Sequence, residues 1–187
     1  DISKTIDELR FVKEIHVVSV VNEVKELLFV LEKDFNKSIT VKTINFNKKI
    51  TQSFDFQYLK NNTSNYISPK KYIYEPNASI LKSGGFHEVS NQLNVEKLQQ
   101  HSHLYTSENC IEFPGRTFLV EKICNYNKKE IQQNLKDNKA NITTRNFPET
   151  VAQIRKKTKI KDGGSQYLFF TTVNNNKLKV LICSQVF

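Results

Sequence analysis

The sequence predicts a mixed fold, in which an α/β segment at residues 1–60 is followed by an α+β region that ends the chain. A β-branched run at residues 14–21 is typical of a buried parallel strand. Apolar residues at helical spacing follow over residues 23–35. Beyond residue 112, strand and helix patterns alternate and finish in a hairpin, which is typical of a compact α+β unit.

Residues 1–60 are predicted to form the end of a larger α/β sheet. Asn22 is a good N-cap, because its side chain can accept a hydrogen bond from the first turn of a helix. The apolar side chains of that helix share one face, and they are Val24, Leu27, Leu28, Leu31 and Phe35. Strands at 39–46 and 54–58, joined by a turn at 47–49, complete this part as a hairpin. Because His16 falls in the buried run, we expect it to be a packed core side chain.

Residues 61–112 are predicted to be a connecting segment, because the polar stretch NNTSN at 61–65 lacks periodicity and is typical of a linker. The stretch YIYEPNASILKSGGF, residues 72–86, indicates an extended end, a proline in a first helical turn and glycines that end the helix. Glu75 is expected to hydrogen-bond backbone groups at the Pro76 corner. A helix around 87–93 and an extended segment at 103–106 follow.

Residues 113–187 are predicted to be a separate α+β domain. The pattern predicts a strand at 116–123, a helix at 128–136, a strand at 140–145 and a helix at 148–157. A hairpin of 166–173 and 177–184 around three asparagines ends the chain. This order gives a sheet with both helices on one face.

The charge of the chain favours an anionic partner, with nucleic acid first and an anionic membrane surface second. The net charge is +9, and the isoelectric point is about 9.4. The alternative is a general drift in composition toward lysine and asparagine. Only four of the 28 cations are arginines, so the positions of the arginines are more informative than those of the lysines.

Two of the arginines lie in a cationic group within the last domain. Arg145 ends a predicted strand, and Arg155 begins a run that ends the following helix. Arginine binds phosphate through paired N–H groups and stacks on bases. The predicted RNA-binding residues are Arg145, Arg155, Lys156, Lys157, Lys159 and Lys161. The alternative is a solvated helix end, where cations interact favourably with the helix dipole.

No motif in the chain indicates catalysis or metal binding. His101 and His103 are two residues apart, but no nearby cysteine or carboxylate completes a ligand set. Cys110, Cys124 and Cys183 are expected to be free thiols in a reducing cytoplasm. No apolar run reaches the ~20 residues of a membrane span. Because the chain begins at Asp1 and contains no methionine, we expect it to be part of a longer product.

Several stretches resemble one known family. KEIHVVSVVNEVKELL, residues 13–28, resembles the last third of a class I S-adenosylmethionine-dependent methyltransferase with its Rossmann-like sheet. YIYEPNASILKSG at 72–84 and HLYTS at 103–107 resemble a ferredoxin-like segment that follows this domain in a bacterial subgroup. FPGR at 113–116, NITTRNFP at 141–148 and IKDGG at 160–164 are similar to the THUMP-like domain of that subgroup.

The resemblance implies a role in positioning RNA for a catalytic half that lies upstream. It implies S-adenosylmethionine as the cofactor of the full-length protein, whereas no glycine precedes Gly84 to form a cofactor loop in this chain. No catalytic or cofactor-binding residue is therefore assigned, and the chain alone is predicted to be inactive. The alternative is a structural or protein-interaction module that braces the methyltransferase core and serves a substrate other than RNA.

The resemblance also predicts an open sheet edge. In class I methyltransferases the strand equivalent to the one from Glu14 to Val21 pairs with an upstream strand that this chain lacks. An open apolar edge recruits another chain. We therefore expect a second copy of the chain to bind through this strand, or else the N-terminal arrangement to be altered. The other expected partners are the upstream methyltransferase half and RNA.

Overall fold

The computed structural model describes residues 2–48, 50–58 and 64–186, and the chain divides into two compact units. Unit 1 holds Asp1–Thr63 and Pro76–Asn94, and unit 2 holds Ser64–Glu75 and Val95–Phe187. Part of the predicted linker, residues 61–63, and Lys49 of the predicted turn lie outside the described residues. No helix in the described ranges is both long and apolar enough to cross a membrane.

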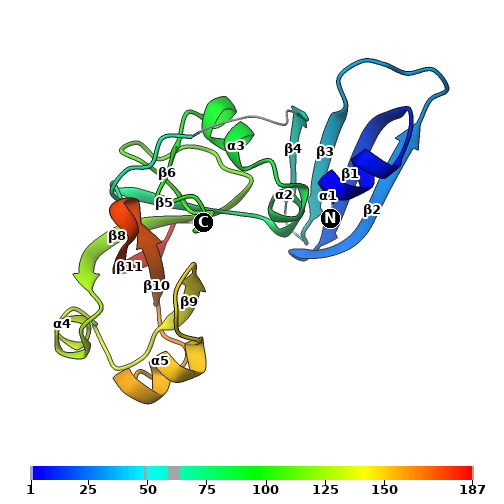
Figure 1. Ribbon diagram of the computed structural model, residues 1–187. Coiled ribbons are helices and arrows are strands. Elements are labelled where there is room, and N and C mark those ends of the chain that lie inside the picture. Colours follow the sequence, from blue (N-terminus) through cyan, green and yellow to red (C-terminus); the bar gives the residue numbers. More distant parts are fainter. Residues whose placement is uncertain (1, 49, 59–63, 187) are drawn as a thin grey trace. The chain divides into compact units, whose positions relative to one another are not determined.

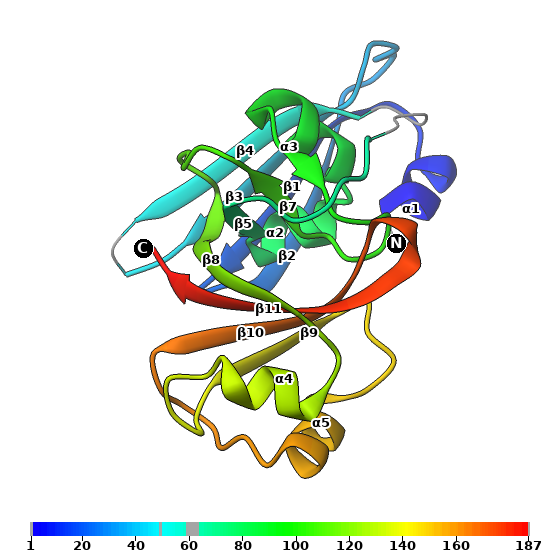
Figure 2. The same ribbon diagram turned by 90° about the vertical axis from the view of Figure 1, so that its left-hand side faces the viewer.

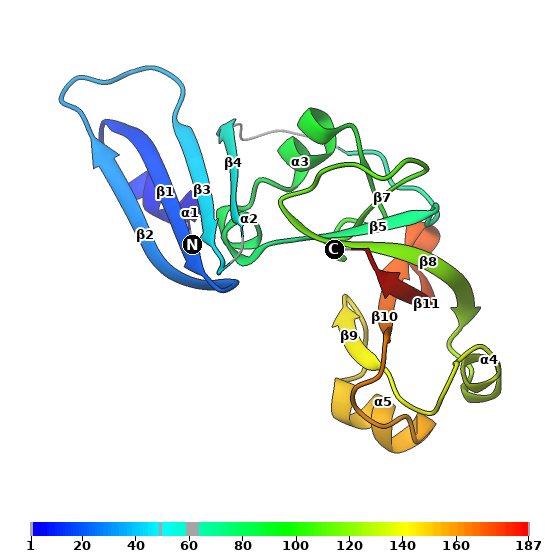
Figure 3. The same ribbon diagram turned by 180° about the vertical axis from the view of Figure 1, so that it is seen from behind.

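Unit 1 is built on a four-stranded sheet of order β2-β1-β3-β4. Its strands are β1 (Val12–Val20), β2 (Glu23–Leu31), β3 (Thr40–Phe46) and β4 (Thr51–Gln57). The unit also contains the helices α1 (Ile2–Glu8), α2 (Ala78–Ser83) and α3 (Phe86–Leu93). β1 is parallel to β3 and antiparallel to β2, and β3 and β4 form the predicted antiparallel hairpin. Figure 3 shows β1 between β2 and β3.

The helix predicted after Asn22 is wrong, because this segment is the strand β2. Val21 and Asn22 both have positive φ, 51° and 61°, and they form a two-residue turn that folds β2 back on β1. Such turns match the twist of paired strands. The apolar residues of 23–31 fit a helical period as well as a strand, and the tight turn at Asn22 decides between the two.

The mixed sheet does not reproduce the predicted Rossmann-like end, in which a helix separates the first two strands. The strand from Glu14 to Val21 has β2 on one side and β3 on the other, so it offers no open edge. The open edge from which the homodimer was expected is therefore not present on this strand. The outer strands of this sheet are β2 and β4.

The two faces of the unit 1 sheet differ in burial. Ile15, Val17 and Val41 are fully buried on the face that α2 covers. The opposite face carries His16, whose Nε2 lies 2.8 Å from Oε2 of Glu14, and its side chain is 34% exposed. The expectation that His16 is a core residue is therefore wrong. The same face exposes the apolar side chains of Val20, Leu28, Val30 and Phe46.

The two glycines after α2 have different roles. Asn77 caps the helix by accepting a hydrogen bond from Ile80, so Pro76 ends the strand β5 (Tyr72–Pro76) rather than opening the helix. Gly84 ends α2 with φ of 78°, as predicted. Gly85 has an ordinary φ of −69°, but a Cβ there would lie 2.5 Å from Cε1 of Phe56.

We expect Gly85→Ala to destabilise unit 1 by about 1–3 kcal/mol, because the buried Phe56 ring would have to move. Gly84→Ala should also destabilise, but through backbone strain at positive φ, because no atom lies within 4 Å of a Cβ there. Urea unfolding measures both losses. A second change, Phe56→Leu, should recover stability in Gly85→Ala and not in Gly84→Ala, and equal recovery in both would contradict the steric explanation.

Unit 2 is built on a seven-stranded sheet of order β6-β7-β5-β8-β11-β10-β9. Figure 1 shows β8, β11, β10 and β9 of this sheet. Besides β5, its strands are β6 (Glu96–Lys97), β7 (Tyr105–Ser107), β8 (Gly115–Asn125), β9 (Asn141–Arg145), β10 (Gln166–Val173) and β11 (Lys177–Gln185). The predicted hairpin of 166–173 and 177–184 is confirmed as β10 and β11, with Asn175 at φ 57° in the turn. The helices are α4 (Lys128–Gln133) and α5 (Val151–Thr158).

Two apolar cores lie on the two faces of this sheet. On one face, Ile131 of α4 and Ile154 of α5 pack with residues such as Phe170 of β10. The prediction that both helices share a face is therefore confirmed, and Figure 2 shows them on the same side of β9, β10 and β11. On the other face, Phe118 and Phe169 meet edge to face at 4.8 Å in a core with the segments around β5 and β7.

Candidate anion-binding site

The structure separates the predicted cationic residues into two groups at opposite ends of β9. Arg145 is the last residue of β9. Lys161 pairs with Lys139, two residues before the strand begins. The five residues of β9 span about 13 Å at ~3.3 Å per residue. Arg145 therefore does not act at the same point as Lys161.

The first group, called here the α5 lysine group, consists of Lys156, Lys157, Lys159 and Lys161. All four are exposed, and they lie in the last turn of α5 and in the loop that follows. A capping box at Thr150 and Gln153 fixes the start of α5, and Lys159 ends it with φ of 64°. Lys139, which the sequence analysis missed, is also exposed and is brought beside Lys161 by a backbone bridge.

Three of the six predicted RNA-binding cations make ion pairs within unit 2, and these are Arg155, Lys157 and Arg145, which is described below. Arg155 donates to the carbonyls of Ile160 and Ala140 and pairs with the Asp162 carboxylate. It therefore fixes the loop after α5. Lys157 lies 2.8 Å from Glu149, and this hydrogen bond lowers the pKa of Glu149.

The second group forms around Glu75, whose side chain is only 4% exposed. Arg145 donates from Nε and Nη2 to Oε1 of Glu75, at 3.0 and 2.5 Å. Arg116 donates from Nε to Oε2 at 2.8 Å, and its Nη2 also contacts Oε2. Each carboxylate oxygen therefore holds one guanidinium. This Arg116–Glu75–Arg145 arrangement is called here the arginine fork.

The strands of unit 2 set the geometry of the fork. Glu75 lies on β5, Arg116 on the neighbouring β8, and Arg145 at the end of β9. The guanidinium carbon of Arg116 also lies 5.4 Å from the centre of the Phe118 ring, a cation–π contact that helps to fix its plane. The side chains of Arg116 and Arg145 are 40% and 35% exposed. Both guanidiniums are thus anchored at one edge and open to solvent elsewhere.

The predicted role of Glu75 is wrong, and no role was predicted for Arg116. Glu75 was expected to bond backbone groups at Pro76, whereas its hydrogen bonds are to two arginine side chains. Arg116 lies 41 residues and Arg145 lies 70 residues from Glu75 along the chain. The only local signal was arginine itself, because two of the four arginines in a lysine-rich chain meet at this carboxylate.

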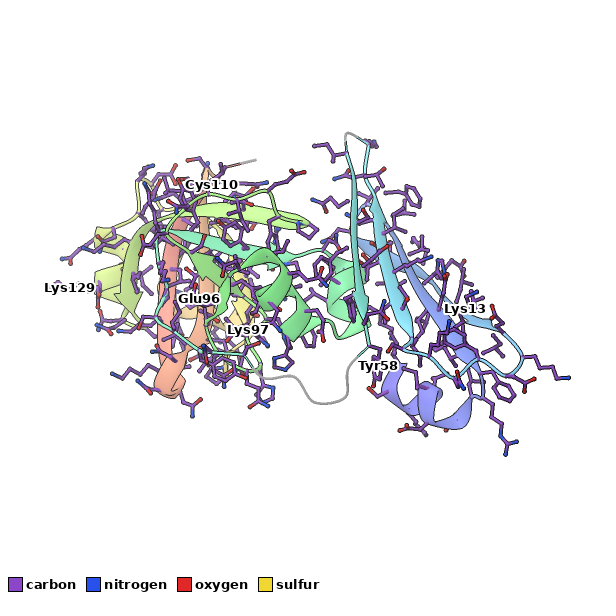
Figure 4. All side chains as sticks on the ribbon, turned by 90° about the horizontal axis from the view of Figure 1, so that it is seen from above. Lys13, Tyr58, Glu96, Lys97, Cys110 and Lys129 are labelled. Atoms are coloured by element: carbon purple, nitrogen blue, oxygen red, sulfur yellow. The ribbon has the colours of Figure 1, made fainter. Side chains whose placement is uncertain are left out.

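Two further basic side chains lie in unit 2 near Arg145. His103 has a pKa lowered to about 4, first by burial and then by the positive charges of Lys97, His101 and Arg145. Burial lowers the pKa of Lys97 to about 8, and its Nζ donates to the carbonyl of Gln100 at 3.0 Å. Figure 4 labels Lys97 beside Glu96 on β6. At pH 7 His103 is therefore neutral.

The described residues offer no site for a metal ion, since no three His, Cys, Asp or Glu side chains among them lie close enough together. Cys110 is exposed, whereas Cys124 and Cys183 are buried, and burial raises the pKa of both buried thiols. The first 83 residues contain no glycine, so they cannot supply a glycine-rich loop for S-adenosylmethionine.

Comparisons with known proteins assign two consecutive stretches of the chain to known domain families. Residues 72–114 match a ferredoxin-like domain family, and residues 115–185 match a THUMP domain-like family. None of the curated proteins compared with the chain matches it. A solved structure, described as a "putative methyltransferase" from Porphyromonas gingivalis W83, is similar over 98% of this chain, with 34% identity and a TM-score of 0.89. The chain spans 48% of that protein. The chain therefore contains a ferredoxin-like segment followed by a THUMP-like segment.

Proposed function

We propose that this chain is the substrate-binding part of an S-adenosylmethionine-dependent methyltransferase and that unit 2 binds structured RNA. The observation that carries the proposal is the α5 lysine group, four exposed cations within six residues of the THUMP-like segment. The likeness to a solved structure described as a "putative methyltransferase", of which the chain spans 48%, supports a role as one part of such an enzyme. In this proposal, S-adenosylmethionine and the catalytic residues belong to the rest of the enzyme.

The chemistry of this binding is contact between ammonium groups and backbone phosphates. Such contacts release counterions from the nucleic acid, so affinity falls steeply as salt rises. The four lysines are exposed and lie together at one end of a short helix, and a phosphate backbone following this surface would meet several of them at once. Lys139 adds a fifth cation beside Lys161.

The test is RNA binding by the full 187-residue chain. A fluorescently labelled RNA hairpin is titrated at several salt concentrations while its anisotropy is measured. We expect replacement of the four lysines of the α5 lysine group by glutamine to weaken RNA binding at least tenfold. The slope of the logarithm of the binding constant against the logarithm of the salt concentration should decrease by roughly one for each phosphate that is no longer neutralised. The matched control replaces Lys33, Lys37, Lys48 and Lys82, which are exposed lysines of unit 1, and should leave most of the affinity.

A wild-type chain without measurable affinity at low salt would contradict the proposal. Equal decreases in affinity in the two quadruple variants would also contradict it, because they would mean that net charge alone causes the binding.

A second candidate function, a brace for the methyltransferase core, is favoured by the exposed apolar side chains of unit 1. Val20, Leu28, Val30 and Phe46 are each 40–49% exposed on one sheet face. Monomeric proteins rarely leave a large contiguous apolar surface uncovered. The solved neighbour also contains a part that this chain does not match. If the brace is the function, that part, produced as a separate polypeptide, should bind this chain. Leu28→Asp should then weaken that binding without changing RNA affinity.

A further inference from the structure

We propose that Arg116 and Arg145, both held by Glu75, form a binding site for a single phosphate group. The site extends the proposed function. It depends on that function only for the assignment of the phosphate to an RNA backbone. It lies at the end of β9 opposite to the α5 lysine group. It would therefore hold a different part of the RNA.

The first argument is charge. One buried carboxylate needs one guanidinium to neutralise it, and Glu75 has two. The fork therefore has a net charge of about +1, and the positive charges of Arg145 and Lys97 both act on His103. A purely structural ion pair would need only one of the two arginines, so the second positive charge calls for an anion.

The second argument is the number of donors. A guanidinium has five N–H groups in a planar fork. The contacts with Glu75 use the Nε and Nη2 side of each arginine. The Nη1 side is not needed for these contacts, and both side chains are more than one third exposed. Two guanidiniums that present N–H groups to solvent suit the several acceptor oxygens of a phosphate.

The third argument is that binding requires little rearrangement. Both guanidiniums are already positioned by the carboxylate, and Arg116 is also stacked on Phe118. Positioning of this kind removes part of the entropy cost of binding, which for a free arginine side chain is large.

The first experiment uses inorganic phosphate as the probe and does not depend on RNA. The chain has only four arginines, so a ¹H–¹⁵N spectrum of the arginine Nε–H groups contains four signals to assign, those of Arg10, Arg116, Arg145 and Arg155. We expect the Arg116 and Arg145 signals to shift and saturate as phosphate is added at constant ionic strength. The Arg10 and Arg155 signals should not saturate. If the chemical shifts of all four signals changed in parallel without saturating, the proposal of a phosphate site would be contradicted.

Conservative variants test the geometry. Arg116→Lys and Arg145→Lys keep the positive charge beside Glu75 but lose the fork of N–H groups. Each should weaken phosphate binding at least fivefold, and Arg10→Lys, at an exposed position in unit 1, is the matched control. Wild-type affinity in both fork variants would show that general positive charge attracts the phosphate, which would also overturn the site.

The second experiment identifies the source of the phosphate. The labelled RNA hairpin is titrated against the same three variants. A decrease of about tenfold in RNA affinity for the fork variants, with none for Arg10→Lys, supports an RNA phosphate. Unchanged RNA affinity together with saturable phosphate shifts would overturn the RNA assignment and indicate a free phosphate or phosphomonoester. Absence of RNA binding by the wild type with the phosphate shifts intact would count against the proposed function alone.

Discussion

Glu75→Gln is expected to destabilise unit 2 by on the order of 3 kcal/mol, the cost typical of removing one partner from a buried ion pair. Glutamine has one acceptor oxygen, whereas both carboxylate oxygens of Glu75 accept from arginine. One guanidinium would then face an NH₂ group instead of an acceptor, and both positive charges would lose their counterion. The partial exposure of the two arginines keeps the destabilisation at the low end of the range for buried pairs.

Urea unfolding combined with hydrogen exchange at the amides of β5, β8 and β9 measures this destabilisation. The matched control is Glu32→Gln, because Glu32 is also paired with a cation, Lys13, but is 54% exposed. Exposed pairs contribute little to stability, so the control should not differ measurably from the wild type. Equal stability of the two variants would contradict the structural role of Glu75.

A triple variant separates stability from binding at the same site. Replacing Glu75 by leucine and both fork arginines by methionine removes every charge, and apolar replacements of buried ion clusters are often neutral or stabilising. The stability of this triple variant shows whether an apolar cluster would fold as well at this position. Retention of a charged cluster where an apolar one would fold as well is consistent with a ligand-binding role. We expect the triple variant to bind no phosphate and to have the same free energy of unfolding as the wild type.

The order of elements in the last 75 residues followed from local patterns, and the reasons are physical. The strands there contain β-branched and aromatic residues, and the turns contain asparagine or glycine, which tolerate positive φ. The helix predicted from residue 128 begins there, after the N-cap Asn127, whereas the helix predicted from Pro148 begins at Val151, after the N-cap Thr150. The element type was therefore fixed by short-range chemistry that a sequence displays directly.

The errors arose where short-range signals are ambiguous or silent. The residues of β2 repeat with a spacing that suits helix and strand alike, and Asn22 suits both a helix cap and a hairpin turn. The arginine fork gave no local signal, because its three members come from three strands that the fold brings together. The pairing of Lys139 with Lys161 was missed for the same reason.

Lys97 is expected to make unit 2 more stable as the pH rises from about 8 to about 10.5. The side chain is among the largest that are fully buried, and burial lowers its pKa from 10.5 to about 8. Between these two values the unfolded chain holds the proton and the folded chain does not. Stability therefore rises with pH in this window and is lowest below pH 8, and the change is on the order of 3 kcal/mol.

Comparison with Lys97→Met isolates this effect from the titration of the other lysines and tyrosines. Circular dichroism followed through urea unfolding at pH 7.5, 9 and 10 gives the free energy of unfolding of each protein. At pH 7.5 the variant should be more stable by about 1–2 kcal/mol, because it avoids burying an ammonium but loses the hydrogen bond to the carbonyl of Gln100. By pH 10 the wild type should equal or exceed it.

The matched control is Lys129→Met, since Lys129 is exposed on α4 at the outside of unit 2 (Figure 4). It should follow the wild-type pH dependence throughout. The ammonium of Lys97 lies 6.0 Å from the ring of Tyr105, and its charge contributes to lowering the pKa of His103. Lys97→Met should therefore also raise the pKa of His103, which a ¹H–¹³C titration of the histidine rings can follow. A His103 titration and a stability profile identical to those of the wild type would mean that Lys97 does not carry its charge in the folded interior.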